Sequence, residues 1–437
     1  MENTDGYKAL NAELFSRMLE IFGKTYYVTT DSRKVKKDCI FVALQGEKFN
    51  GNKFAVQALN DGAAVAIIDD KDYYVDDRTV LVEDSLLFLQ RFARYYRDTW
   101  TIPVIAISGT NGKTTTKELI KAVLETKYRV YATQGNLNNQ IGVPLTVLSV
   151  KPDCQIAVIE MGASHEGDID ELCNIADPDA ALLTNIGIAH IEGFGSQEAI
   201  IRTKTELYRY VNAKKGKVFV NTDDTNLLKN SPDGALTYSL HDKAEVRGET
   251  VVREDNYACI RLHGEEIRSH LVGAYNCYNI LASATVGLYY NITKEDIKKA
   301  VGNYYPDNNR SQIKKTKRNT LVMDCYNANL SSCLTALESF KLMHSSDKRV
   351  FIGAMKELGS VSVQAHSEIA KVLSDMNLTQ VILVGEEYAQ SAKEYGFDWF
   401  ATSKQACVYL SKENIQGALI LIKGSRSTEM ELLADVL

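Results

Sequence analysis

Residues 102–115 read IPVIAISGTNGKTT, and this stretch decides the fold of the central part of the chain. Residues 104–107 form a short apolar run, which is typical of a buried strand. A turn containing Gly109 and Gly112 follows, and residues 115–125 then have the pattern of a helix. Glycines let backbone N–H groups converge on an anion, and a helix N-terminus is electropositive. The order strand, glycine-rich turn, helix therefore predicts a phosphate-binding loop.

The residues that end this turn suit a nucleoside triphosphate. We predict that the Lys113 ammonium reaches the outer phosphates and that the Thr114 hydroxyl binds Mg²⁺. The spacing is two residues shorter than in the common P-loop, and Ile107 stands where the longer pattern has its first glycine. The alternative is an ordinary strand-to-helix turn, which the flanking strand and helix disfavour. The predicted nucleotide-binding residues of the loop are Gly109, Thr110, Asn111, Gly112, Lys113, Thr114 and Thr115.

The composition of the 437 residues is that of a globular protein of two to four domains, with 45% hydrophobic and 24% charged residues. A net charge of −6 argues against nucleic acid as the main partner. No apolar run is long enough to cross a bilayer, and the first residues do not resemble a signal peptide. The eight cysteines include no C-x-x-C pair, which indicates reduced thiols. We therefore predict a cytoplasmic protein without a membrane or nucleic-acid partner.

Three successive segments alternate strand-like and helix-like patterns, which predicts an α/β protein with mostly parallel sheets covered on both faces. The predicted domains are 1–98, 99–305 and 306–437. The region 236–272 is hairpin-like and predicts an antiparallel flank. The last segment predicts a doubly wound, Rossmann-like unit, but no G-x-G-x-x-G follows its first strand, so a dinucleotide site is not indicated. The predicted strands are 39–46, 63–69, 79–84, 104–107, 155–160, 180–186, 217–221, 320–326, 349–355, 380–385 and 418–424; helices are predicted at 52–63 and 86–98.

Two further residues follow predicted strands at the sheet edge where the loop is expected. Glu160 ends the apolar run 155–160, and a carboxylate there can hold Mg²⁺ beside a phosphate loop. The alternative is a strand-end glutamate that faces solvent. His190 lies in a glycine-rich stretch after the strand 180–186. A lone histidine is usually structural, and this one gains interest only from the edge that it shares with Thr114 and Glu160.

Lys204 falls in the middle of the apolar stripe of a predicted helix, residues 196–211. Burial of an ammonium without a partner is costly. Three explanations stay open on this pattern: an ion pair, a side chain that extends to the edge of the stripe, or a chemical modification that changes the charge.

Together these motifs resemble the Mur ligases, which are ATP-dependent amide ligases of bacterial cell-wall synthesis. The resemblance covers nearly the whole chain and implies a small N-terminal UDP-sugar-binding domain, a central ATPase domain and a C-terminal domain that binds the incoming substrate. Two motifs point to the member that adds D-alanyl-D-alanine to UDP-N-acetylmuramoyl-tripeptide through an acyl phosphate. The motifs are GTNGKTTT at 109–116, GNLNNQIGVPLT at 135–146, EMGA at 160–163, NIGIAHIEGFGS at 185–196, TKTE at 203–206, GAYNCYN at 273–279, DCYNAN at 324–329, GAMKELG at 353–359 and KGSR at 423–426; the second and seventh of these indicate that member.

The resemblance also implies roles for single residues. Lys204 would be carbamylated by CO₂ and would bind a second Mg²⁺ with His190, while Thr114 and Glu160 bind the first; Lys113, Glu160, His190 and Lys204 would be the catalytic set. The chain would act as a monomer in peptidoglycan precursor synthesis. Implied nucleotide contacts are Asn276 and Asn279 for adenine, Arg310 for phosphate and Asp324 for ribose; implied substrate contacts are Ser32, Arg33, Asn136, Asn138 and Asn139, with Lys423 and Arg426 as candidates for the dipeptide.

Departures from the family pattern leave the expected metal and phosphate residues intact. Asn52, Tyr275, Asn309 and Cys325 stand where other members often have His, His, Gly and Ser. Three alternatives remain: a sibling ligase that adds a single amino acid, a P-loop kinase or switch, and a non-catalytic nucleotide-binding scaffold. The absence of a DNPR motif disfavours the diaminopimelate- or lysine-adding sibling, and the absence of N-K-x-D disfavours a GTPase switch.

Overall fold

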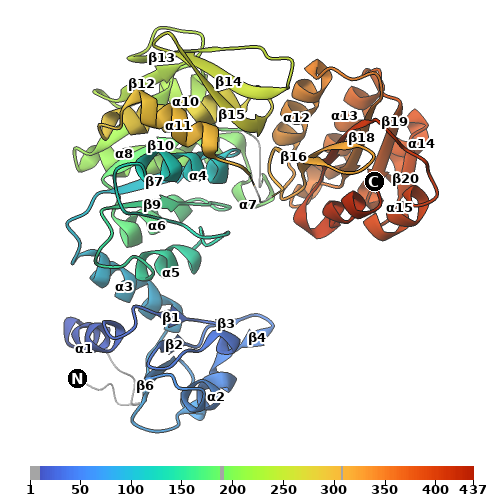
Figure 1. Ribbon diagram of the computed structural model, residues 1–437. Helices are drawn as coiled ribbons and strands as arrows, with labels where there is room; N and C mark the ends of the chain where they lie inside the picture. The colour runs from blue at the N-terminus through green and yellow to red at the C-terminus, as the bar shows by residue number, and fades with distance from the viewer. Residues whose placement is uncertain (1–9, 188–190, 307–308) are drawn as a thin grey trace.

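The computed structural model describes residues 10–187, 191–306 and 309–437. Three main sheets follow one another along the chain, and Figure 1 shows them arranged as an arc with the N-terminal part at the bottom and the C-terminal part at the right. This arrangement confirms the predicted α/β class with three domains. The predicted limits at 98/99 and 305/306 fall between the sheets, and as limits they stay predictions. Among the described residues, no helix combines the length and apolarity that a membrane span requires.

The N-terminal part is a small parallel sheet, in the order β1-β2-β5-β6, flanked by helices. Helix α3 begins where the Asp84 side chain accepts the N–H of Leu87, and its last turn carries two arginines. Helix α1 has a side-chain cap from Asn11. The elements are α1 (Ala12–Phe22), β1 (Val28–Thr29), β2 (Ile40–Val42), β3 (Gln45–Gly46), β4 (Phe49–Asn50), α2 (Ala55–Asn60), β5 (Val65–Ile68), β6 (Thr79–Leu81) and α3 (Ser85–Arg97).

The central sheet has the order β15-β14-β13-β12-β11-β10-β7-β9-β8 and is parallel from β8 to β13. Its strands are β7 (Val104–Ser108), β8 (Val130–Ala132), β9 (Ile156–Glu160), β10 (Ala180–Leu183), β11 (Lys217–Asn221), β12 (Leu236–Ser239), β13 (Val246–Thr250), β14 (Tyr257–Leu262) and β15 (Glu265–Val272). Its helices are α4 (Lys113–Leu124), α5 (Gly142–Leu148), α6 (Asp168–Ala176), α7 (Ile191–Phe194), α8 (Gln197–Ala213), α9 (Thr225–Lys229), α10 (Asn276–Tyr289) and α11 (Lys294–Asn303).

The two faces of the central sheet pack into different hydrophobic cores. Alternate residues of β7 point to opposite faces, so Val104 and Ala106 join one core, and Ile105 and Ile107 join the other. The first core continues without a break into the N-terminal part, where it includes Phe92 of α3. This explains why the strand before the loop is apolar throughout.

The C-terminal sheet has the order β16-β17-β21-β18-β19-β20, with every pairing parallel except that of β16 with β17. Its hydrophobic clusters are separate from those that link the first two parts. The elements are β16 (Gln312–Lys315), β17 (Thr320–Asp324), α12 (Leu330–Leu342), β18 (Lys348–Gly353), α13 (Ser362–Ser374), β19 (Gln380–Val384), α14 (Ala389–Tyr395), β20 (Asp398–Phe400), α15 (Ser403–Leu410) and β21 (Leu419–Lys423).

The prediction of an antiparallel flank over 236–272 is wrong for its first strands. Strand β12 pairs parallel to β11, with Leu236 opposite Phe219, and β13 pairs parallel to β12. The chain can return in the same direction because α9 lies between β11 and β12 and supplies a crossover. Only β13, β14 and β15 form the antiparallel flank.

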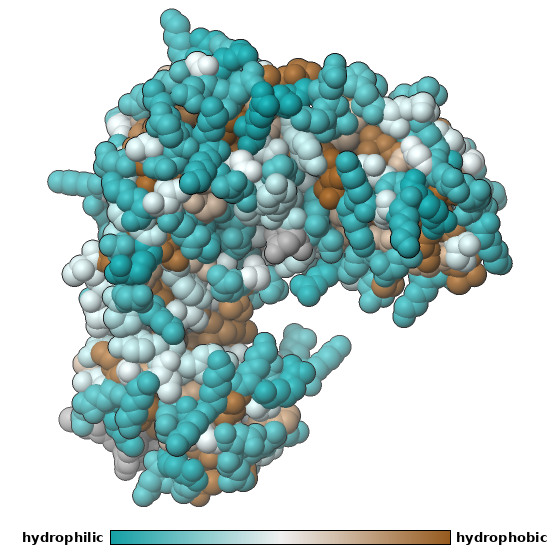
Figure 2. All heavy atoms as spheres, viewed as in Figure 1, coloured by the Kyte–Doolittle hydropathy of each residue, from teal (hydrophilic) through white to brown (hydrophobic). Residues whose placement is uncertain are grey.

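Figure 2 shows that the molecule is deeply hollowed between its lower and right-hand parts. A cavity of about 1350 Å³ lies at the carboxyl ends of the central strands and is lined by residues of both the central and the C-terminal parts. This is the edge where open α/β sheets bind their ligands.

Candidate active site

The loop between β7 and α4 depends on two glycines. Gly109 has φ +134°, and a Cβ there would lie 2.1 Å from Thr184 Oγ1. Gly112 has φ +78°, and a Cβ there would lie 2.8 Å from Asn279 Oδ1. Both positions therefore combine a left-handed backbone with close neighbours, and only glycine satisfies both conditions.

The segment after β10 fixes the backbone of the loop. Thr110 N donates to Asn185 O at 2.9 Å, and Asn111 N donates to Asn185 Oδ1 at 3.0 Å. The Asn111 carbonyl accepts Thr184 Oγ1 at 2.6 Å. The sequence analysis did not single out Thr184 and Asn185. The available signal was their position, since polar residues directly after a buried strand share the edge where the loop lies.

Lys113 begins helix α4 and folds back over the loop. Its Nζ donates to Gly109 O at 2.9 Å and to Thr110 O at 3.1 Å. Burial lowers the pKa of Lys113; the Glu160 carboxylate opposes this shift and the Arg310 guanidinium adds to it. Gly112 supplies no side-chain cap to α4, which leaves the N–H groups of the first turn available for an anion.

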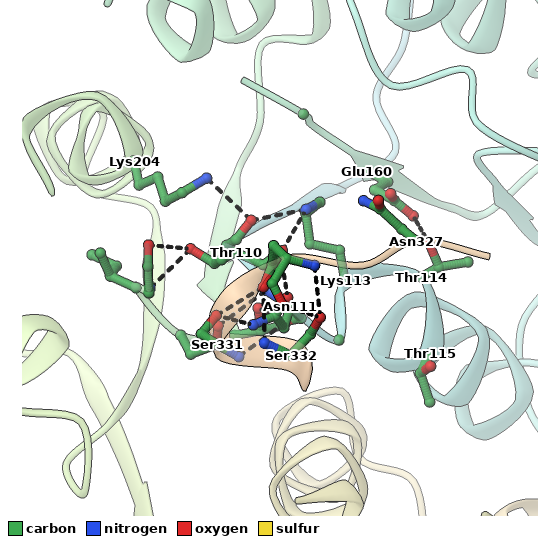
Figure 3. A pocket seen from close by; sticks show the side chains of 18 of the residues that line it. Thr110, Asn111, Lys113, Thr114, Thr115, Glu160, Lys204, Asn327, Ser331 and Ser332 are labelled. Carbon is green, nitrogen blue, oxygen red and sulfur yellow. Dashed lines mark hydrogen bonds between the residues drawn. The ribbon is translucent and has the colours of Figure 1, made fainter. Parts of the chain in front are cut away.

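Thr114 and Glu160 meet directly beside Lys113, as Figure 3 shows. Thr114 Oγ1 donates to Glu160 Oε2 at 2.9 Å, and Asn138 Nδ2 donates to Oε1 of the same carboxylate at 2.8 Å. Thr133 Oγ1 accepts the backbone N–H of Glu160 at 2.9 Å. Glu160 is therefore buried and oriented toward the loop, unlike a solvent-facing residue at a strand end.

Lys204 extends from helix α8 toward the same loop (Figure 3) and is only 3% exposed. Its Nζ donates to Gly109 O at 3.1 Å, so Lys204 and Lys113 share one carbonyl acceptor. Burial, and then the nearby charge of Lys113, lower the pKa of Lys204 to about 7. The side chain does not extend to solvent, and its hydrogen-bond partner is a carbonyl instead of a carboxylate.

The residues beside the loop suit Mg²⁺ as far as the structure describes them. Mg²⁺ prefers oxygen ligands and usually takes only one or two carboxylates in addition to water and phosphate oxygens. Thr114 and Glu160 offer a hydroxyl and a carboxylate 2.9 Å apart. Among the described residues, no three His, Cys, Asp or Glu side chains gather as a metal site. His190, the fourth expected metal ligand, lies outside the described residues.

The expected nucleotide residues lie at the same cavity. Asn276 and Asn279 at the start of α10 line it; Asn279 Nδ2 donates to Asn276 Oδ1 at 2.7 Å, and Thr116 Oγ1 donates to Asn279 Oδ1 at 3.0 Å. This chain of bonds ties α10 to the helix that begins with Lys113. Thr115, which also lines the cavity, is buried in the first turn of that helix.

Two expected nucleotide residues come from the C-terminal part. The guanidinium of Arg310 stacks 3.8 Å from the centre of the Tyr326 ring, and its Nε has no hydrogen-bond partner among the described residues. Asp324 ends β17 and accepts Lys423 Nζ at 2.7 Å. Burial opposes the charge of Lys423, but the Asp324 carboxylate outweighs this effect and raises the pKa of the lysine.

The expected substrate residues divide between two places. Asn136, Asn138 and Asn139 line the cavity, and Asn139 Oδ1 accepts the backbone N–H of Gly142 at the start of α5 at 2.9 Å. Ser32 and Arg33 do not line it; they lie in a short turn after β1, where Arg33 pairs with Asp31 at 2.9 Å. Their role as substrate contacts stays a prediction.

Further cavity residues were missed by the sequence analysis. They lie at the end of β11 and directly after it, in the stretch NTDDTN, or on α10. For the residues at β11, the available signal was again a polar run at the end of a buried strand. Asp224 caps α9 and also accepts Ile186 N at 3.2 Å. The missed residues include Asn221, Asp223, Asp224 and Tyr278.

Comparison with known proteins gives a consistent assignment along the whole chain. Residues 24–97 match the description "Mur ligase family, catalytic domain", residues 107–287 "Mur ligase middle domain" and residues 309–426 "Mur ligase, glutamate ligase domain". UDP-N-acetylmuramoyl-tripeptide--D-alanyl-D-alanine ligase of Bacillus subtilis is 34% identical over 92% of this chain and 91% of the relative. The chain belongs to the Mur ligase family.

Other Mur ligases agree in sequence and in structure. The enzyme of the same description from Escherichia coli is 31% identical over 92% of both chains. A crystal structure of MurF from Acinetobacter baumannii superposes with a TM-score of 0.85 at 30% identity and covers 94% of this chain and 92% of that one. MurF ligase from Thermotoga maritima, solved in complex with ADP, gives a TM-score of 0.82 at 29% identity and covers 94% and 96%.

Proposed function

We propose that this Mur ligase uses ATP to join D-alanyl-D-alanine to UDP-N-acetylmuramoyl-tripeptide in the synthesis of peptidoglycan precursors. The observation that carries the proposal is the convergence of Lys113, Lys204 and the Thr114–Glu160 pair on one glycine loop, inside a cavity that two parts of the chain share. The names of the sequence relatives supply the substrates. We also propose that the protein acts in the cytoplasm as a monomer.

The proposed reaction has two steps. A carboxylate oxygen of the tripeptide attacks the γ-phosphorus of ATP, ADP leaves, and an acyl phosphate forms. The dipeptide nitrogen then attacks the acyl carbon, phosphate leaves, and the amine gives up a proton. The first step brings two anions together, which requires fixed positive charge. Lys113 supplies part of that charge from the first turn of α4, and Arg310 approaches the loop from the C-terminal part.

Bound Mg²⁺ would neutralise phosphate charge in this site. We propose that Thr114 and Glu160 hold one ion, and that His190 and a carbamylated Lys204 hold a second. The burial of Lys204 and its pKa of about 7 support the modification, because a neutral amine can react with CO₂. Carbamylation would convert a buried cation into an anion.

A second cavity, of about 220 Å³, supports a place for the dipeptide. It lies in the C-terminal part between the segments that contain Asn327, Lys356 and Arg426. The Ser425 hydroxyl also lines it, is buried, and has no hydrogen-bond partner among the described residues. We infer that Arg426 and Ser425 bind the dipeptide carboxylate. Lys423, the other candidate, is already paired with Asp324.

The decisive experiment supplies purified protein with ATP, Mg²⁺, UDP-N-acetylmuramoyl-tripeptide and either D-alanyl-D-alanine or single amino acids. We expect ADP and phosphate only when the tripeptide and the dipeptide are both present. Turnover with a single amino acid and none with the dipeptide would indicate a sibling ligase. A stable phosphorylated product formed without any amine would indicate a kinase.

A further inference from the structure

The side chain of Asn111 joins the phosphate loop to the C-terminal part of the molecule. The backbone of Asn111 is bound to Thr184 and Asn185, while its side chain points to the start of helix α12 (Figure 3). Asn111 Nδ2 donates to Ser331 Oγ at 2.9 Å, and Asn111 Oδ1 accepts Asn329 Nδ2 at 3.0 Å. Both polar atoms of the amide are thus bound to one helix end.

The three side chains form a closed ring. Ser331 Oγ donates to Asn329 Oδ1 at 3.0 Å, which completes the circuit Asn111–Ser331–Asn329 with one donor and one acceptor at each bond. Asn329 is also the N-cap of α12, since its Oδ1 accepts Ser332 N at 2.8 Å. The ring is therefore fixed to the first turn of the helix. All three side chains are half-buried, and hydrogen bonds joined in a circuit of this kind polarise and strengthen one another.

On the central side of the ring, Gly187 lies against Ser331 and leaves room for its side chain. A Cβ added to Gly187 would lie 3.0 Å from Ser331 Oγ, which is closer than side chains normally approach. Thr110 Oγ1 accepts Gly187 N at 2.9 Å, so the same glycine also supports the loop. The lack of a side chain at Gly187 therefore leaves room for Ser331 of α12 beside the loop.

The ring lies at the edge of the nucleotide site, because Asn111, Asn329 and Ser331 all line the same cavity. The cavity of about 1350 Å³ remains beside the loop while the ring is formed. The uncapped first turn of α4 offers backbone N–H groups, whereas the ring uses only the Asn111 side chain. Docking of the C-terminal part and binding of a nucleotide can thus occur together.

We propose that the Asn111–Asn329–Ser331 ring docks the C-terminal part on the phosphate loop and couples this docking to nucleotide binding, with Ser331 as a positioning residue. The choice of nucleotide as the coupled ligand rests on the proposed function. A phosphate that orders the loop holds Asn111 in place for α12. By linkage, a docked α12 strengthens nucleotide binding by the same factor.

The test compares full-length wild type with Ser331→Ala. This change leaves Asn111 Nδ2 without its acceptor and keeps the Asn329 cap. Loss of a neutral hydrogen bond of this kind weakens binding about five-fold. We expect Ser331→Ala to raise the dissociation constant of Mg²⁺–ADP by about that factor in calorimetry. We also expect a larger radius of gyration by X-ray scattering without ligand. Ser345→Ala, an exposed change in the same domain, should change neither quantity.

A second variant shows whether the effects of Ser331→Ala come from loss of the ring or from local unfolding of α12. Gly187→Ala introduces a methyl group against Ser331 from the central side, so it should give the same two changes while leaving α12 intact. Unchanged ADP affinity or an unchanged radius of gyration in both variants would overturn the proposal. The scattering experiment needs no ligand and no turnover. The scattering result can therefore support docking by the ring even if the ligase assay fails. Likewise, a positive ligase assay would support the proposed function even if the ring does not dock the C-terminal part.

Discussion

At the scale of single residues, the site is defined by two lysines that share one acceptor. Lys113 and Lys204 come from different helices, and both donate to the carbonyl of Gly109. Burial is the main reason why the pKa of each lysine is lowered, and the nearby charge of Lys113 lowers the pKa of Lys204 further. Lys204 is the one of the two whose pKa, about 7, lies near neutrality.

The lowered pKa of Lys204 predicts a pH-dependent reaction with CO₂. The folded protein binds fewer protons at this site than the unfolded chain between about pH 7 and about pH 10, so the stability cost of burying Lys204 is complete below pH 7 and decreases progressively across that range. The neutral amine attacks the carbon of CO₂, a proton leaves, and a carbamate forms. With ¹³C-bicarbonate, we expect a carbamate signal in the NMR spectrum that grows from about pH 6 to pH 8.

Lys204→Arg is the matched control, because arginine keeps the cation and does not deprotonate in this range. A wild-type signal that persists unchanged in Lys204→Arg would assign the carbamate to another amine. No signal at any pH would contradict carbamylation of Lys204.

At the scale of elements, the strand, loop and helix around 104–124 act as one unit. Two requirements coincide at Gly112: a left-handed φ of +78° and contact with Asn279 of α10. The loop geometry thus depends on a helix more than 160 residues later in the chain.

Gly112→Ala should therefore lower both stability and ATP binding. The left-handed backbone alone costs about 1–2 kcal/mol for a residue with a Cβ, and the new methyl group would also lie 2.8 Å from Asn279 Oδ1. We expect a lower urea midpoint and a higher KM for ATP. Gly234→Ala has φ +73° with no neighbour within 4 Å, so it should show the backbone cost without the change in KM. Equal effects of both variants on KM would show that the contact with α10 is unimportant.

The elements also show what sequence patterns can predict. The strand before the loop was recognisable because both of its faces are buried, which gives a continuous apolar run. Strands β16 and β20 were missed because they lie at the edges of their sheet and are partly exposed. The direction of β12 depended on a crossover that the local pattern does not contain. Helix α1 was also missed, although Asn11 is a cap of the kind that marks a helix start.

The sequence predicted the candidate active site in part, as it did the strands and helices. Residues of the loop and Glu160 could be found because they follow strands in a recognisable order. The bonds of Asn111 to Asn329 and Ser331 could not be found from the sequence. They join segments that are far apart in the chain, and only the packing of the central and C-terminal parts brings these segments together. The sequence showed that Lys204 lies in an apolar stripe, but it did not show that the carbonyl of Gly109 accepts its hydrogen bond.

At the scale of the whole molecule, the three parts are attached to one another in different ways. Helix α3 packs against α5 and α6, and one hydrophobic core runs from the N-terminal part into the central part. The C-terminal part is built on two other clusters, of which one includes only Val272 of the central part among its buried residues, and it reaches the loop through polar contacts such as Asn111 with Ser331. We therefore expect the first two parts to behave as one unit and the third to move relative to them.

Arg97 provides a direct test of this division. It is 5% exposed at the end of α3, and its guanidinium donates to Ala176 O at 2.9 Å, to Asp177 O at 2.8 Å and to Asp179 Oδ2 at 3.1 Å. Arg97→Ala removes all three hydrogen bonds and leaves the buried Ala176 carbonyl without this partner, at a cost of about 2–3 kcal/mol. In urea unfolding, the transition of the joint N-terminal and central unit should shift to lower urea, while that of the C-terminal part stays in place. Arg91→Ala, an exposed change on the same helix, should shift neither transition. If Arg97→Ala instead loosened the N-terminal part alone, the shared core would not unite the two parts, and the N-terminal part would also be free to move during closure.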